Sequence, residues 1–252
     1  MHTSSILNQY MDGAAAAIRQ ITQAARQSCA GGKPMLQDYP FWLYNAVFAD
    51  YSAVTFLTKC ISAVEYFDVR PLYCIVRSTL EKYADLANLH AKGRVYENYL
   101  WYLNFESNSL ESFAAGNDEK GREFRRQAES YKRICMETFG LSRCNRLTRY
   151  YLMRDFNGLL SWEERSFIVP FNKKLSYIDS KCSQLLHNNV TFAARVSQEE
   201  IQEILLYMHY VMWTVQQLLP MFYTWPLPEI QEGSVQLRRA IECIHAGRAL
   251  TE

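Results

Sequence analysis

The sequence predicts an all-α protein, built as a multi-helix bundle. Apolar residues recur at helical spacing in nearly every long segment, among Ala, Leu, Gln, Glu and Arg, which favour helices. The alternating β-branched runs typical of strands are missing, and the 252 residues include only 10 glycines and 7 prolines. Hydrophobic residues make up 49% of the chain, which is enough to bury a core. We expect an N-terminal helix and linker over residues 1–34, and a bundle domain with a single core over residues 35–252.

Glycines, prolines and N-capping residues divide the chain into expected helices. The segment Cys29–Pro34 holds two glycines and a proline that end the first helix, and Gly93 precedes an aromatic-rich one. Ser161 and Ser197 each begin a capping box of the form S-x-x-E, and Pro170 is expected to break the helix that starts at Ser161. The expected helices cover residues 5–27, 38–66, 68–92, 93–116, 118–140, 161–170, 175–190, 197–228 and 230–245.

Cysteine usage and the first residues of the sequence favour a cytoplasmic protein. Seven widely spaced cysteines without a C-x-x-C pair fit reduced thiols, and the first residues lack the basic and apolar regions of a secretory signal. The stretch 204–228 carries no charge, but His209, Gln216 and Pro220 favour a central bundle helix, so we expect no membrane span. Net charge is +1, yet residues 119–154 hold ten Lys or Arg against four Glu, a local charge of +6.

The stretch from Leu175 to Val190 sorts onto the faces of one helix. Its apolar face gathers Leu175, Ile178, Cys182, Leu185 and Leu186. A stripe along the polar edge holds Ser176, Ser180, Ser183 and His187. Small hydroxyl side chains permit another helix to come close. His187 is then either a solvated or hydrogen-bonded residue of an amphipathic helix, or a working group in a cleft between helices.

A second polar face lies on the helix expected over residues 68–92. Arg77 and Glu81 are one turn apart and can pair, and Asp85 and Asn88 share their side. The alternative is a solvated charged face.

The chain has no H-E-x-x-H, no paired E-x-x-H, no phosphate-binding G-x-x-x-x-G-K-[ST], no zinc spacing and no G-x-S-x-G. We therefore expect no metal and no cofactor.

The combination of R-x-x-x-E (Arg77 to Glu81) with a later S-x-x-x-H (Ser183 to His187) in a helical chain resembles the HEPN superfamily over about residues 40–222. Many HEPN proteins are dimeric ribonucleases of toxin–antitoxin and phage-defence systems. The resemblance implies a HEPN-like bundle, a homodimer, metal-independent cleavage of RNA or binding of a nucleotide, and an antitoxin or defence partner protein.

The resemblance also implies roles for individual residues. His187 would act as general acid or base on the ribose 2′-hydroxyl or the leaving oxygen. Arg77 or Lys181 would stabilise the negative charge of the phosphorane, and Glu81 would orient Arg77. The phosphate would be positioned by Ser183 and Asn188. HEPN ribonucleases carry an arginine shortly before this histidine. Here Lys181 takes that place, with five residues between it and His187. The ammonium group of lysine does not reproduce the forked contact that a guanidinium makes with phosphate.

A basic segment offers a separate nucleic-acid site. Arg143, Arg146 and Arg149 recur at intervals of three, with Tyr150, Tyr151 and Arg154 beside them. Basic residues interleaved with aromatic ones can hold phosphates and stack bases. Solvated arginines bordering a core helix explain the same pattern.

The competing function is a binding or regulatory module without catalysis. In this interpretation Arg77, Glu81, Ser183 and His187 form a polar network that is satisfied internally and fixes the packing of two helices.

Overall fold

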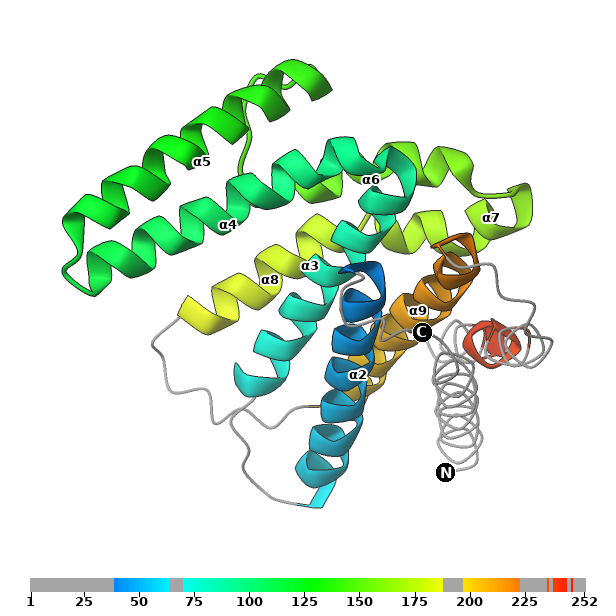
Figure 1. Ribbon diagram of the computed structural model, residues 1–252. Helices are drawn as coiled ribbons and strands as arrows, with labels where there is room; N and C mark the ends of the chain where they lie inside the picture. Colours follow the sequence, from blue (N-terminus) through cyan, green and yellow to red (C-terminus); the bar gives the residue numbers. More distant parts are fainter. Residues whose placement is uncertain are drawn as a thin grey trace, which may run out of the picture. The chain divides into compact units, whose positions relative to one another are not determined.

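A computed structural model describes residues 39–63, 70–187, 197–222, 235, 238–243 and 246, and confirms the predicted all-α class. The described residues form eight long helices and no strand (Figure 1). These are α2 (Tyr39–Ala63), α3 (Arg70–Lys92), α4 (Arg94–Ala114), α5 (Asp118–Phe139), α6 (Thr148–Leu159), α7 (Trp162–Asn172), α8 (Leu175–His187) and α9 (Gln198–Phe222). The helix and linker predicted for residues 1–34 lie outside the described residues.

None of the helices in the described ranges is long and apolar enough to cross a membrane.

The chain divides into two compact units. The first unit comprises residues 1–86 and 161–252, and so contains α2, α3 as far as Leu86, α7, α8 and α9. The second unit comprises residues 87–160 and contains the end of α3 with α4, α5 and α6. The single core expected over residues 35–252 stays a prediction.

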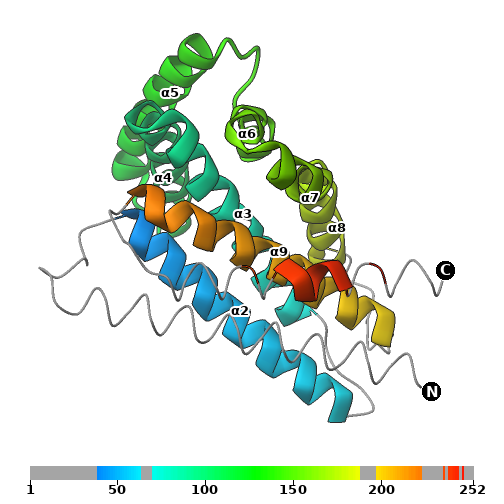
Figure 2. The same cartoon turned by 90° about the vertical axis from the view of Figure 1, so that its right-hand side faces the viewer.

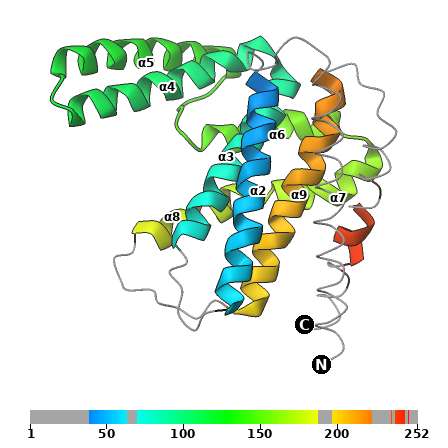
Figure 3. The ribbon, with the colours of Figure 1, turned by 60° about the horizontal axis from the view of Figure 1, so that its bottom comes forward.

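The core of the first unit is made by apolar faces of its helices. Helices α2 and α9 pack along each other, as Figures 2 and 3 show from two sides. The apolar arc of α3 repeats at helical spacing and is buried at Leu72, Val76, Leu80 and Tyr83. On α8 the predicted apolar face is buried at Leu175, Ile178 and Cys182.

Two expectations for α3 and α7 need correction. The solvated charged face, one of the two interpretations of this side of α3, does not hold for Asp85 and Asn88, which are buried. Pro170 was expected to break the helix that follows Ser161, but α7 continues to Asn172 and contains it. The proline lies in the last turn, where a missing N–H donor removes a single intrahelical bond.

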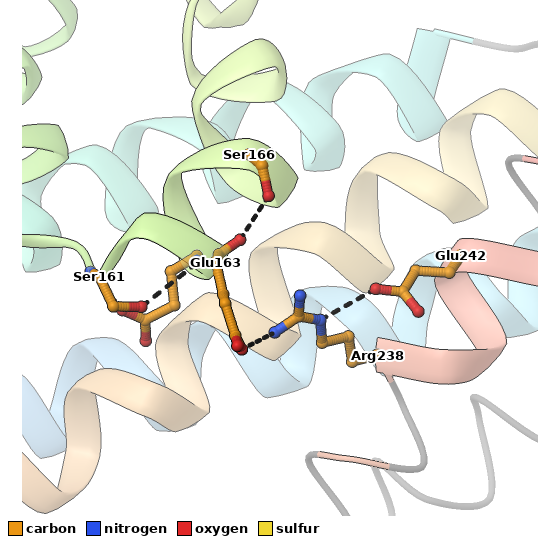
Figure 4. Close-up of polar contacts among 6 residues, drawn as sticks. Ser161, Glu163, Ser166, Arg238 and Glu242 are labelled. Atoms are coloured by element: carbon orange, nitrogen blue, oxygen red, sulfur yellow. Dashed lines mark hydrogen bonds and ion pairs between the residues drawn. The ribbon is translucent and has the colours of Figure 1, made fainter.

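The beginning of α7 follows the predicted capping box. The Ser161 side chain accepts a hydrogen bond from the Glu164 backbone N–H at 3.3 Å, and the Glu164 carboxylate accepts one from the Ser161 N–H at 2.8 Å. Figure 4 shows this turn beside Arg238, which lies between Glu163 of α7 and Glu242. The predicted cap at Ser197 is also present, because its hydroxyl accepts from the Glu200 N–H at 3.1 Å.

The second unit is organised around an antiparallel pair of helices, α4 and α5, which run side by side (Figure 1). Close approach depends on Gly121, where an added Cβ would lie 2.8 Å from the Phe113 ring. The buried Ser109 hydroxyl donates to the Gly121 carbonyl oxygen at 2.9 Å. Three tyrosines of α4, about one turn apart, are buried: Tyr96, Tyr99 and Tyr102.

Candidate functional site

The polar face of α3 forms an ion-pair cluster with α8. The Arg77 Nε atom lies 3.6 Å from a Glu81 carboxylate oxygen on its own helix and 3.4 Å from a carboxylate oxygen of Asp179 on α8. We call Arg77, Glu81 and Asp179 the Arg77 cluster. The side chains of Arg77 and Glu81 are 22% and 25% exposed, and that of Asp179 is 1% exposed. The predicted pairing of Arg77 with Glu81 is therefore present, and its innermost member is an aspartate.

Sequence reasoning missed Asp179. Its position lies on the buried side of α8, one turn after Leu175 and just after Ile178. An acidic side chain among apolar neighbours was a signal, because a carboxylate is buried at this depth only when it is paired or hydrogen-bonded. Arg77 supplies the opposite charge from another helix, so the contact joins α3 to α8.

The thiol of Cys182 lies in the same neighbourhood. Burial raises its pKa to about 12, and the negative charge of Asp179 adds to this rise. The positive charges of Lys181 and Arg77 oppose it. At neutral pH the Cys182 sulfur is therefore a protonated thiol, and it offers no nucleophile to this site.

The other predicted catalytic residues follow along α8. Lys181 is exposed and Ser183 is half-buried. His187 is the last residue of α8, but its side chain and all of Asn188 lie outside what the structure describes.

The position of His187 along α8 bears on its predicted meeting with Arg77. Arg77 contacts α8 at Asp179, eight residues before His187. At 1.5 Å per residue this is a separation of about 12 Å along the helix axis. The predicted meeting of the Arg77 and His187 side chains is untested and stays a prediction.

The charge of the Arg77 cluster does not favour an anion. One guanidinium faces two carboxylates, giving the three residues together a formal charge of −1. Lys181, whose positive charge acts on the neighbouring Cys182, brings the formal charge of the four residues to zero. A phosphate approaching Arg77 would have to compete with Asp179, which is already buried against it.

The basic segment predicted for nucleic acid lies in the second unit. Arg143 is exposed and Arg146 half-buried in the loop before α6, and Arg154 is exposed on α6. Arg149 is only 5% exposed, because it lies on the buried side of the first turn of α6. Its predicted role stays untested, but so buried a guanidinium has little surface to offer a phosphate.

An exposed tyrosine completes this segment. The Arg154 guanidinium carbon lies 4.5 Å from the centroid of the Tyr151 ring, which is 50% exposed. The Arg154 side chain is 63% exposed, and its Nε lies 3.7 Å from an oxygen of Asp155. We call the solvent-accessible cations of this segment and the exposed tyrosine, Arg143, Arg146, Tyr151 and Arg154, the basic–aromatic surface; of these residues, Tyr151 and Arg154 contact each other.

Buried tyrosines hold the loop that carries these arginines. The Tyr99 hydroxyl lies 2.9 Å from the carbonyl oxygens of both Asn145 and Arg146 and donates its proton to them. The Asn145 N–H donates to the Thr148 hydroxyl at 3.0 Å, and the Asn145 side chain accepts from the Leu147 N–H at 2.9 Å. The loop backbone is therefore fixed while its arginine side chains face outward or lie half-buried.

Comparisons with protein-family models, with curated proteins and with solved structures found no match to this chain. The resemblance to the HEPN superfamily, the homodimer and the antitoxin or defence partner therefore stay predictions.

Proposed function

We propose that this chain binds single-stranded RNA without cleaving it, through the basic–aromatic surface of its second unit. The stacking of the exposed Arg154 guanidinium on the exposed Tyr151 ring carries the proposal. An accessible ring beside cations offers a base a face to stack on and offers its phosphates a counter-charge. Single-stranded RNA presents both groups at once, whereas in a duplex the bases are stacked inside.

Pre-organisation of the loop supports this proposal. Hydrogen bonds from Tyr99 fix the backbone at Asn145 and Arg146 before any ligand arrives. Binding then costs less conformational entropy, because only side chains remain to be ordered. The net charge of the second unit points the same way, since residues 87–160 hold twelve Lys or Arg against nine Asp or Glu, a charge of +3.

In this proposal the Arg77 cluster is structural. It locks α3 to α8 within the first unit, with the buried Asp179 as its anchor. This assigns to Arg77 and Glu81 the role of a closed network and leaves ligand binding to another part of the chain.

Salt-dependent RNA binding tests the proposal. The triple variant Arg143→Ala, Arg146→Ala and Arg154→Ala should bind a labelled single-stranded RNA more weakly, and the slope of log K against log[salt] should fall by about 0.7 for each lost phosphate contact. Tyr151→Ala should cost about 1–3 kcal/mol of binding free energy through the lost stacking. Fluorescence anisotropy over a series of salt concentrations measures both effects.

A matched control comes from α5. Arg122, Arg125 and Arg126 are exposed in the same unit, so replacing all three with alanine removes the same charge from another surface. The control variant should keep most of the affinity. Equal losses in the two triple variants would mean that charge alone, and not the basic–aromatic surface, attracts RNA.

A metal-independent ribonuclease is the second candidate. One observation favours it: Lys181 and Ser183, on the helix that ends at His187, can be reached by solvent. In this candidate His187 removes the proton from a ribose 2′-hydroxyl, the oxygen attacks the adjacent phosphorus, and the 5′-oxygen leaves with a proton. Lys181 or Arg77 stabilises the added negative charge, Glu81 orients Arg77, and Ser183 and Asn188 position the phosphate.

Incubation of RNA with the protein in EDTA tests this candidate. If the ribonuclease assignment is right, wild type cleaves the RNA and His187→Ala loses the activity. The variant should keep its melting temperature, because position 187 lies off the apolar face that the sequence predicts for this helix. A stable His187→Ala protein that cleaves as fast as wild type would remove His187 from catalysis. Intact RNA with wild type supports binding without cleavage.

A further inference from the structure

Two cysteines of the second unit form a buried pair that neither proposed function uses. Cys135 lies in the last turns of α5, and Cys144 lies in the loop before α6. Both side chains are buried, and a side-chain hydrogen bond between the two thiols shifts the pKa of each. Both are free thiols. We call them the dithiol pair.

A tight turn ends α5 between the two cysteines. Gly140 caps the helix in the left-handed conformation (φ 61°), and the Leu141 N–H donates to the Met136 carbonyl oxygen at 2.9 Å. The chain therefore turns back directly after the helix. Only eight residues separate Cys135 from Cys144, and the Tyr102 hydroxyl lies 3.5 Å from the Cys144 carbonyl oxygen.

The surroundings distinguish the two thiols. The hydrogen bond from Cys135 lowers the pKa of Cys144, the Thr148 hydroxyl and the charge of Lys132 lower it further, and burial and Glu106 oppose them. The pKa of Cys135 is raised, by the same hydrogen bond and by burial. Cys144 is thus the sulfur that more readily becomes a thiolate, and Cys135 the one that keeps its proton. A thiolate next to a second thiol is the usual arrangement of an oxidisable cysteine with a resolving partner.

We propose that Cys135 and Cys144 are a redox-active site that closes reversibly to an intramolecular disulfide, with a peroxide as the oxidant. The Cys144 thiolate attacks one oxygen of hydrogen peroxide, and the O–O bond breaks. Hydroxide departs as the leaving group, and Cys144 becomes a sulfenic acid. The Cys135 sulfur then attacks the Cys144 sulfur, and the sulfenic oxygen leaves as water with the Cys135 proton. The two sulfurs together lose two electrons and the peroxide gains two.

Closure would cross-link the end of α5 to the loop before α6. The cross-linked segment contains Arg143, and Arg146 lies two residues after its end. The disulfide would therefore restrain the loop that carries two arginines of the basic–aromatic surface. The redox proposal itself does not depend on RNA binding, because its test reads the bond between the sulfurs.

Peroxide treatment of the native full-length protein, followed by non-reducing digestion and mass spectrometry, tests the inference. We expect a peptide pair linking Cys135 to Cys144, with a mass lower by about 2 Da than that of the two free peptides, and its return to free thiols on treatment with a dithiol reductant. Exposed Cys74 serves as the internal control, because it reports how readily peroxide oxidises an accessible thiol of the same protein.

Two results would overturn the inference. In one, Cys74 is oxidised while the dithiol pair stays reduced in the folded protein. In the other, Cys144 accumulates sulfinic acid without a link to Cys135. A Cys135→Ser variant distinguishes the roles of the two cysteines. Without the Cys135 thiol, the sulfenic acid on Cys144 should persist and be trapped by a dimedone probe.

Discussion

Replacing Arg77 with alanine is expected to lower the free energy of unfolding by about 3 kcal/mol. The loss is large because Asp179 is 1% exposed and would keep a charge in the interior without the guanidinium 3.4 Å away. Glu81, at 25% exposure, can be hydrated in place and adds less. Urea unfolding of wild type and variant, followed by circular dichroism, measures the difference.

Two further variants show whether the buried charge is the cause. Adding Asp179→Asn to Arg77→Ala should restore part of the lost stability, because it removes the charge that was left behind. Arg238→Ala serves as a surface control, since Arg238 pairs with Glu163 and Glu242 at the protein surface (Figure 4) and should cost less than about 1 kcal/mol. Similar losses in the free energy of unfolding for Arg77→Ala and Arg238→Ala would show that the Arg77 cluster stabilises the protein no more than a surface ion pair does.

Lowering the pH from 7 to 5 is expected to remove about 2 kcal/mol of stability through His209 alone. His209 is buried in α9, its Nε2 lies 3.2 Å from the Tyr51 hydroxyl oxygen, and burial lowers its pKa to about 3. In the unfolded chain the pKa returns to about 6.5. Between these values the unfolded state binds a proton that the folded state does not, so stability is full above pH 7 and falls with decreasing pH.

The comparison with His209→Gln isolates this contribution. The glutamine keeps a polar group near Tyr51 but does not titrate, so the stability difference between pH 7 and pH 5 should shrink by about 2 kcal/mol. Subtraction cancels the other shifted groups, including His90, whose pKa burial lowers, and Glu200, whose pKa burial raises. An unchanged pH dependence in the variant would mean that His209 is protonated in the folded protein.

Most of the helical architecture follows from local patterns. The apolar arc of α3 and the apolar face of α8 repeat every three or four residues, so each helix reveals its buried side without reference to the rest of the chain. The caps at Ser161 and Ser197 are local as well, because the hydroxyl and the N–H that it binds lie three residues apart. The expected bounds of α4 and α5 and the end of α7 differ from the structure by a few residues, whereas α6 was not among the expected helices.

The site was less predictable because its contacts join distant parts of the chain. Asp179 is a single acidic residue on an apolar face. Its partner Arg77 lies about a hundred residues earlier, so the local sequence gives no indication of the pair. The three-residue spacing of Arg143, Arg146 and Arg149 suggested one common surface. Because α6 begins at Thr148, the first two lie in a loop and Arg149 lies on the buried side of a helix.

The tyrosines of α4 show the same limit. Their spacing predicted an aromatic helix, which α4 confirms. The partners of the Tyr99 hydroxyl are backbone oxygens of Asn145 and Arg146, and backbone groups leave no mark in a sequence. The anchoring of the loop could therefore be found only from the fold.

We propose that RNA binds at the basic–aromatic surface and not at the Arg77 cluster or His187. A single anisotropy titration of labelled single-stranded RNA tests it most directly, with wild type, His187→Ala and the triple variant of Arg143, Arg146 and Arg154. We predict wild-type affinity for His187→Ala, and a loss of tenfold or more for the triple variant, about 1.4 kcal/mol of binding free energy. Full affinity in the triple variant together with a loss in His187→Ala would contradict the claim and place the RNA site on α8.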